Sequence, residues 1–264
     1  MWQPDGWGWR ARVGVLTPHA DIGPESEFRA MAPDGVSIHA ARVPLGAYTP
    51  GGAIERPIAG DAARAFAEPP LVDDATELLA AAPLQAIAYC FTSSSYVRGA
   101  ADDALLQARL EVRARNIPVV ITCASATLAL RALDVQRLAL VNPPWFSAEL
   151  SERGAEYFRA QGFEVVLGRR AELPADQDAI KPQELYDWIR AHMPKSAEAV
   201  FIGGNGFRAV GVIGALEHDL GRPVLTANQV AFWHALNTRV PVTNYGQIFS
   251  RAVPGGVNGG AVSS

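Results

Sequence analysis

Cysteine is scarce in this sequence. Only two of the 264 residues are cysteines, Cys90 and Cys123. Two cysteines cannot by themselves build a disulfide framework or a metal cluster. We therefore expect a reducing, cytoplasmic environment and no metal site.

A dominant charge and long apolar runs are also lacking. Lys and Arg number 23 against 27 Asp and Glu, a net charge of −4, and no basic block argues for nucleic acid as a partner. No apolar run approaches the ~20 residues of a membrane span. The N-terminus lacks the basic-then-apolar order of a signal peptide. Neither a P-loop nor a G-x-G-x-x-G fingerprint occurs, so no cofactor is expected.

Strand and helix patterns alternate along the whole chain. The predicted strands span residues 12–18, 36–45, 86–90, 117–123, 137–143, 163–168, 198–204 and 222–228. The predicted helices span residues 74–83, 100–116, 125–133, 147–162, 181–193, 207–221 and 228–238. This alternation predicts an α/β fold with parallel sheets and helices outside. In helix 100–116, the expected inner face consists of Leu105, Leu106, Leu110 and Val112.

Two polar turns interrupt this pattern at corresponding places in two comparable halves, which meet near residue 135. In the first half the run AIAYC (86–90) ends in FTSSS, and in the second AVFIGG (199–204) ends in NGFR. Open α/β sheets bind ligands at the carboxyl ends of their strands. The two turns are therefore expected to face each other across a cleft.

The residues of each turn are compatible with two roles, ligand binding or a purely structural role. Thr92, Ser93 and Ser94 are expected to hold an anion, or to cap a helix that begins there. The segment of Asn205, Gly206 and Arg208 offers free N–H groups before a predicted helix, which suits an anion, or is only a tight connection.

Cys90 stands at the border between the apolar run and the first polar turn. Neighbouring strand residues point to opposite faces, so Cys90 belongs to the core if Phe91 faces the cleft. A shift of one residue would instead bring the thiol to the cleft as a catalytic group. Both interpretations stay open at this point.

The chain resembles the aspartate/glutamate racemase superfamily, and most closely the maleate cis-trans isomerases and arylmalonate decarboxylases. The segments that carry the resemblance run from about residue 12 to 249 and include RVGVLTP, AYCFTSSSYVRG, IGGNGFR and RPVLTANQVAFWHAL. The resemblance implies two pseudo-symmetric Rossmann-like halves with an active-site cleft between them. The N-terminal half would span residues 12–134 and the C-terminal half residues 135–224. Residues 225–250 would pack back on the N-terminal half, and residues 251–264 would form a flexible tail.

The positions that carry the chemistry of this family are changed here. The family uses two cysteines, one in each turn, and the decarboxylases keep only the second. At those positions this chain has Phe91 and Gly204. A carboxylate-binding asparagine of the family corresponds to Asp21, and a carboxylate-binding tyrosine to Trp145. The resemblance also implies that Thr92 and Ser93 hold a carboxylate or an oxyanion.

Asp21 is the most informative of these changes. A carboxylate there would repel a dicarboxylate by roughly 1 kcal/mol in water and about 4 kcal/mol at an effective dielectric constant of 20. Asp21 is expected to act as an acid or base tuned by His19, to pair with a cation, or only to cap its turn. Phe91 and Trp145 would suit an amine or a flat ring.

Three functions are compatible with these residues. The first is a divergent, cofactor-independent isomerase, lyase or hydrolase for a small carboxylate that bears an amine, amide or ring. The second is a non-catalytic metabolite-binding or assembly protein, and the third a maleate-like isomerase that uses Cys90. The resemblance also implies a homo-oligomer, a dimer or a tetramer.

Overall fold

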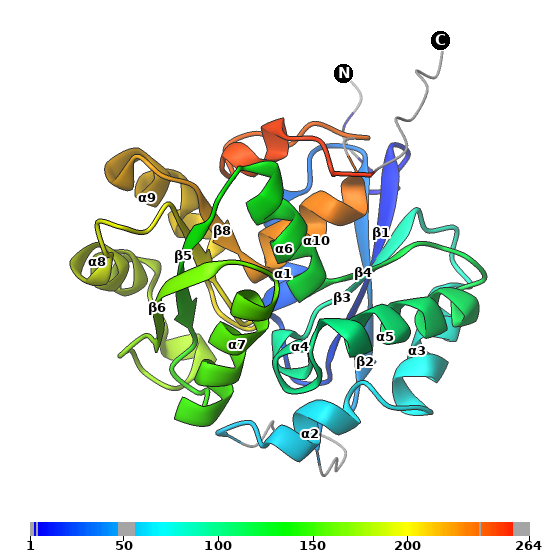
Figure 1. Ribbon diagram of the computed structural model, residues 1–264. Coiled ribbons are helices and arrows are strands. Elements are labelled where there is room, and N and C mark those ends of the chain that lie inside the picture. The colour runs from blue at the N-terminus through cyan, green and yellow to red at the C-terminus, as the bar shows by residue number, and fades with distance from the viewer. Residues whose placement is uncertain (1–2, 4, 47–55, 238, 256–264) are drawn as a thin grey trace.

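Two four-stranded parallel sheets organise the chain in the computed structural model, which describes residues 3, 5–46, 56–237 and 239–255 (Figure 1). The N-terminal sheet contains β1 (Ala11–Pro18), β2 (Val36–Val43), β3 (Ala86–Tyr89) and β4 (Val119–Ile121), in the order β2-β1-β3-β4. The C-terminal sheet contains β5 (Arg137–Asn142), β6 (Glu164–Arg170), β7 (Ala199–Ile202) and β8 (Val224–Thr226), in the order β6-β5-β7-β8. The second sheet thus repeats the strand order of the first, which confirms the predicted α/β fold of two similar halves.

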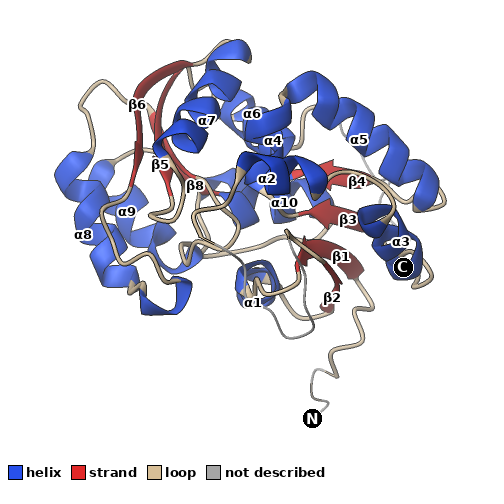
Figure 2. Cartoon of the chain, turned by 90° about the horizontal axis from the view of Figure 1, so that it is seen from below, coloured by secondary structure: helices blue, strands red, loops and turns tan. Residues whose placement is uncertain are grey.

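Helices cover the sheets. The helices of the first half are α1 (Gly23–Met31), α2 (Gly60–Ala65), α3 (Leu71–Leu79), α4 (Thr92–Arg98), α5 (Ala100–Arg113) and α6 (Thr122–Ala132). Those that follow are α7 (Ala148–Ala160), α8 (Pro182–His192), α9 (Ile213–Leu220) and α10 (Ala227–Leu236), with 3-10 turns η1 (Gln177–Ala179), η2 (Val210–Val212) and η3 (Gln247–Ser250). In Figure 2, α3 and α5 lie on the outer side of the N-terminal sheet, and α8 and α9 lie beside the C-terminal sheet.

The burial of the central strands explains why the sequence predicted them. Strands β3 and β7 are buried at every position, as expected for strands with helices on both faces. The edge strands β2 and β6 are only partly buried. The inner strands β1, β3, β5 and β7 are each paired with a neighbour on both sides.

The last helix returns to the first half of the chain. Helix α10 (orange in Figure 1) packs against β3, β4, α6 and α1. The Phe232 ring on α10 lies 5.0 Å from the Phe28 ring on α1. The N-terminal sheet is therefore covered partly by the C-terminal end of the chain.

Helix α5 corrects one prediction. Leu106 and Leu110 are buried, but Leu105 and Val112 are 69% and 74% exposed. The third residue of the buried stripe is Asp103, since residues three and four apart share a helix face. Because Asp103 is acidic, a search for apolar spacing did not identify this face as the buried one.

Helix α9 also differs from its prediction, because regular helix begins at Ile213 rather than at residue 207. Glycines at 204, 206 and 211 weaken helix formation in the preceding segment. The second polar turn therefore does not lead directly into a helix. Most of the tail predicted to be flexible falls on 256–264, outside the described residues. No helix in the described ranges is long and apolar enough to cross a membrane.

Candidate active site between the two sheets

A small cavity lies where the ends of β1, β3, β5 and β7 meet, and we call it the Asp21 cavity. Its volume is about 30 Å³, which leaves room for about two water molecules. It is lined by Pro18, Asp21, Arg56, Ile58, Phe91, Thr92, Ser93, Trp145, Phe146, Gln177, Gly204, Asn205 and Gly206. Residues from both halves, and from loops far apart in the sequence, thus surround one point.

Asp21 is the acidic group of this cavity. Its Oδ1 accepts hydrogen bonds from the Gly23 N–H and from Gln177 Nε2, both at 2.9 Å. Burial raises the pKa of the Asp21 carboxyl above its ordinary value, although these hydrogen bonds and the charges of Arg56 and Arg42 act in the opposite direction. Both hydrogen bonds end on Oδ1, and within the described residues none is recorded to Oδ2.

His19 does not occupy the place that sequence analysis gave it. Its Nδ1 accepts a hydrogen bond from the Leu45 N–H at 3.1 Å, and His19 does not line the Asp21 cavity. Within the described ranges, the structure records no hydrogen bond between the side chains of His19 and Asp21. Gln177 and Gly23, rather than His19, hold the Asp21 carboxyl.

Arg56 supplies the positive charge of the cavity, and sequence analysis missed it. Its guanidinium lies over the Trp145 ring, 4.8 Å from the ring centroid, a distance at which the ring attracts a cation. Arg56 Nη1 donates to the Ala175 carbonyl at 3.0 Å and lies 3.6 Å from Asp176. These contacts hold Arg56 in the lining of the cavity. Arg56 belongs to an irregular loop, so no periodic sequence pattern identifies it.

Aromatic rings form two walls of the cavity. The Phe91 ring packs 4.5 Å from the Phe66 ring, and the Trp145 ring packs 5.7 Å from the Phe207 ring. Phe91 and Trp145 are only 5% and 6% exposed. The cavity is therefore narrow because these two large side chains fill much of the space between the sheets.

The two polar turns are tied to each other. The Thr92 N–H donates to Asn205 Oδ1 at 3.0 Å, and the Gly204 N–H donates to Thr92 Oγ1 at 3.1 Å. Asn205 Nδ2 also donates to Thr122 Oγ1 and to Asn228 Oδ1. Thr92 and Asn205 were predicted to hold a ligand, but these groups already bind one another.

Ser93 and Ser94 of the first turn have different surroundings. Ser94 Oγ is 2.9 Å from the Tyr89 hydroxyl and donates to the Phe91 carbonyl at 3.2 Å, and it is not part of the cavity lining. Ser93 lines the cavity, and no described residue hydrogen-bonds its hydroxyl. Ser93 is therefore the hydroxyl of this turn that can meet a ligand.

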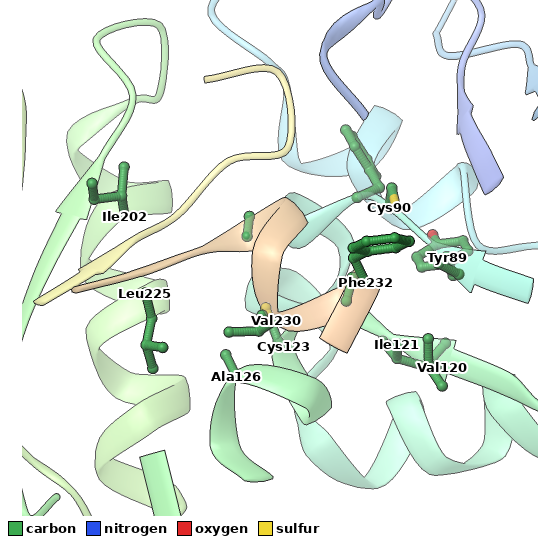
Figure 3. Close-up of a cluster of buried hydrophobic side chains, with 14 of the residues drawn as sticks. Tyr89, Cys90, Val120, Ile121, Cys123, Ala126, Ile202, Leu225, Val230 and Phe232 are labelled. Atoms are coloured by element: carbon green, nitrogen blue, oxygen red, sulfur yellow. The ribbon is translucent and has the colours of Figure 1, made fainter. Parts of the chain in front are cut away.

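Both cysteines lie in the core (Figure 3). Cys90 and Cys123 have no exposed surface, and burial raises the pKa of each thiol. Cys90 does not line the Asp21 cavity, whereas its neighbour Phe91 does. Cys90 is thus a core residue rather than part of the cavity lining, as expected if successive residues point to opposite sides.

The glycines of the second turn leave little space. Gly204 has a φ of +83°, and a Cβ built on it would lie 2.4 Å from Pro143 Cγ. The Pro143 ring therefore fills the space beside Gly204 that a side chain would need. A Cβ on Gly206 would lie 3.0 Å from Asp21 Oδ2, so Gly206 lets the chain pass close to the carboxyl.

Arg208 lies outside the Asp21 cavity. Its side chain is exposed and lines a separate, larger cavity. Among the described residues, no group of three or more His, Cys, Asp or Glu side chains could hold a metal ion. The site consists of one carboxyl, one guanidinium, one free hydroxyl and two aromatic walls.

Comparison with known proteins places this geometry in a family context. A family model described as arylmalonate decarboxylase matches residues 69–249. Comparison with the curated proteins gives no match.

Solved structures of similar fold include a maleate isomerase from Pseudomonas putida S16, a variant crystallised with maleate. It is 21% identical, with a TM-score of 0.78, and the match covers 91% of this chain and 97% of that chain. A maleate cis-trans isomerase variant from Nocardia farcinica, with a covalently bound succinylcysteine intermediate, is 22% identical, with a TM-score of 0.76 and coverage of 90% and 98%. Unliganded arylmalonate decarboxylase is 21% identical, with a TM-score of 0.74 and coverage of 91% and 99%.

Proposed function

Because the chain belongs to the arylmalonate decarboxylase family, we propose that it is a cofactor-independent enzyme in which Asp21 replaces the thiol as the proton-transferring group. The substrate is a small carboxylate that also carries an amide, an amine or a ring. One observation carries this proposal: a buried carboxyl of raised pKa lines the same cavity as a guanidinium.

Arg56 is the group that would bind the substrate carboxylate. It is the only cationic side chain in the lining of the Asp21 cavity within the described ranges. A guanidinium binds a carboxylate through two parallel hydrogen bonds, and the Trp145 ring keeps this one in place. The Ser93 hydroxyl lies in the same lining and would bind the second polar group of the substrate.

Asp21 would then move a proton at the carbon next to the bound carboxylate. A carboxyl whose pKa is raised keeps its proton to a higher pH, and a group titrating closer to neutral pH is a better acid and base. Oδ2 is free to do this because Gly23 and Gln177 hold Oδ1. The bond broken or rearranged at that carbon decides between an isomerase, a lyase and a hydrolase.

The charge balance of the cavity disfavours plain dicarboxylates. One guanidinium neutralises one carboxylate, and a second carboxylate beside an ionised Asp21 would be repelled by roughly 1–4 kcal/mol at 4 Å. A neutral amide or ring can instead accept a hydrogen bond from protonated Asp21 or pack on Phe91 and Trp145. This favours monocarboxylates with a polar or flat second group.

The test compares ligands and then variants. A thermal-shift panel would include maleate, an arylmalonate, aspartate and carboxylates bearing amide, amidine or betaine groups, because ligands of the native state raise its melting temperature. The stabilising compounds are then assayed for turnover with Asp21→Asn, which preserves the size and the Oδ1 hydrogen bonds. We expect the Asp21→Asn variant to retain the ligand-induced shift and to lose at least a hundredfold in kcat.

Arg56→Gln provides the matching control for binding. It should abolish the thermal shift produced by the compounds that the parent protein turns over, with little change in the melting temperature of the free protein. Full turnover by Asp21→Asn, or stabilisation by maleate alone, would reject the role assigned to Asp21.

A second candidate function rests on the size of the cavity. With only about 30 Å³ of free volume, the site also suits a non-catalytic scaffold whose pocket has been filled by Phe91 and Trp145. Absence of any ligand-induced shift across the panel would favour this candidate. The isomerase that uses Cys90 receives no support from the buried position of that thiol, and full activity of Cys90→Ser would exclude it.

A further inference from the structure

A second cavity lies on the far side of the groups that hold Asp21, and we call it the outer cavity. Its volume is about 480 Å³, against about 30 Å³ for the Asp21 cavity. This volume falls within the roughly 300–1,000 Å³ of small-molecule sites in proteins. Gln177 and Gly206 line both cavities, so a wall one side chain thick separates them.

The outer cavity has an apolar wall on α1 and beside η2. Ala30 and Val210 contribute to this wall, and Ile22 at its edge is 53% exposed. An isoleucine exposed beside a hollow favours contact with an apolar group, since burying it removes apolar surface from water. The wall therefore suits the hydrocarbon part of a small molecule.

One positive charge faces this apolar wall. Arg208 lines the outer cavity and is exposed, and within the described part of the chain no hydrogen bond or ion pair engages its guanidinium. It is also the only cationic residue among the described lining residues. A carboxylate matches an unpaired guanidinium through two parallel hydrogen bonds.

The acidic residues of the outer cavity limit the ligand to one negative charge. Glu27 is buried, and its two oxygens accept hydrogen bonds from the N–H groups of Ala209 and Val210 and from Asn228 Nδ2. Asp178 adds an exposed carboxylate to the same lining. A second carboxylate on the ligand would be repelled by Asp178 and by Glu27 where Glu27 is ionised, since burial raises the pKa of Glu27 to about 7.

We propose that the outer cavity is a second binding site, which takes a small monocarboxylate with an apolar body, and that Gln177 transmits its occupancy to Asp21. The carboxylate binds Arg208, and the hydrocarbon packs on Ile22, Ala30 and Val210. Gln177 reaches both places, because it lines the outer cavity while its Nε2 donates to Asp21 Oδ1. A ligand that hydrogen-bonds to the Gln177 amide changes the hydrogen bond that Gln177 donates to Asp21. The binding step does not depend on the proposed catalytic activity.

The test measures binding of hexanoate by calorimetry to the full chain. Hexanol and hexylamine replace the carboxylate by a neutral and a cationic group, and adipate adds a second carboxylate. We expect hexanoate to bind at least tenfold more tightly than each of these three. Arg208→Gln should weaken hexanoate binding tenfold or more, and Ala30→Phe should weaken it by filling the cavity without changing charge. Arg251→Gln, at an exposed arginine that does not line this cavity, is the matched control and should leave binding unchanged.

The two cavities are distinguished by their arginines. Loss of hexanoate binding in Arg56→Gln, with normal binding in Arg208→Gln, would place the ligand in the Asp21 cavity and overturn the proposal. Equal binding of hexanol and hexanoate would overturn the assignment of a carboxylate.

The coupling through Gln177 has its own readout. In protein labelled with ¹³C at the aspartate carboxyl carbon, the Asp21 signal is identified by its absence in Asp21→Asn. Hexanoate should shift this signal in the parent protein and not in Gln177→Ala. An unchanged Asp21 signal at saturating hexanoate would overturn the coupling.

Discussion

The backbone N–H of Thr92 donates to the side-chain oxygen of Asn205 at 3.0 Å and so fastens the start of α4 to the turn after β7. A second hydrogen bond, from the Gly204 N–H to Thr92 Oγ1, runs beside it. The two turns that were expected to face each other across an open cleft are thus joined. Asp21, Arg56 and Ser93 line the cavity beside this junction.

Asn205→Ala should weaken the fold itself. The change leaves the buried Thr92 N–H without its partner and removes the two hydrogen bonds that Asn205 donates to Thr122 and Asn228. Leaving buried polar groups unpaired costs about 1–3 kcal/mol each, so we expect a loss of about 2–4 kcal/mol. Urea unfolding followed by tryptophan fluorescence measures it. Gln183→Ala, at an exposed glutamine, is the control, and a loss below about 1 kcal/mol for Asn205→Ala would contradict the junction.

Gly204→Cys should not restore a usable thiol. The new Cβ would lie 2.4 Å from Pro143 Cγ, and the φ of +83° strains any residue other than glycine. We expect a loss of at least about 2 kcal/mol in unfolding free energy. Adding Pro143→Ala should recover part of this loss in a double-mutant cycle. A Gly204→Cys protein as stable as its parent would show that the turn adapts easily.

Asp103 should make stability depend on pH. Its oxygens accept hydrogen bonds from Ser95 and from the Tyr157 hydroxyl, both at 3.0 Å, and burial raises its pKa to about 6. Because the folded pKa lies above the unfolded one, the folded state binds more protons between about pH 4 and 6, and stability falls as pH rises through that range.

Asp103→Asn should remove this part of the pH dependence. Relative to the parent protein, the variant should gain up to roughly 3 kcal/mol between pH 4 and pH 7, since one pKa unit corresponds to about 1.4 kcal/mol. Unfolding in urea at both pH values gives the difference. Asp102→Asn, at the neighbouring and less buried aspartate, is the control and should show no such gain. Parallel curves for parent and Asp103→Asn would refute the assignment.

The thiols should be inert until the protein unfolds. Cys90 and Cys123 are fully buried, and burial raises both pKa values, whereas reagents attack the thiolate. We expect fewer than about one thiol in ten to react with a disulfide reagent under native conditions, and both to react in denaturant. A fast native reaction that disappears in Cys90→Ser would mean that Cys90 reaches the Asp21 cavity after all.

Sequence analysis found the strands and the fold because buried parallel strands leave continuous apolar runs. It did not predict α1 or α2, and it offered a helix at the place of α4 only as an alternative to anion binding. Helix α4 contains three serines, which favour caps and turns by themselves. It is held instead by contacts such as those of Ser94 with Tyr89 and of Ser95 with Asp103. Helix α1 did leave a signal, the proline in its first turn.

The family placement was also predictable, and the family match confirms it. The resemblance to the family pointed to Asp21, Phe91, Trp145 and Gly204, and all four line one cavity. Arg56 and Gln177 could not be found in this way. Arg56 belongs to an irregular loop and Gln177 to a 3-10 turn, where no sequence periodicity or motif identifies a functional residue. Only tertiary contacts bring these two residues to Asp21.

The return of α10 to the N-terminal sheet has a consequence for synthesis on the ribosome. Strands β3 and β4 are made early, yet one of their covers, α10, is made only after residue 226. Until then the face of the first half that α10 covers stays open, while the strands of the second sheet, β5 to β8, are complete at residue 226. The half translated second is thus the first that can finish folding, and a nascent chain stalled before α10 presents an uncovered sheet to chaperones.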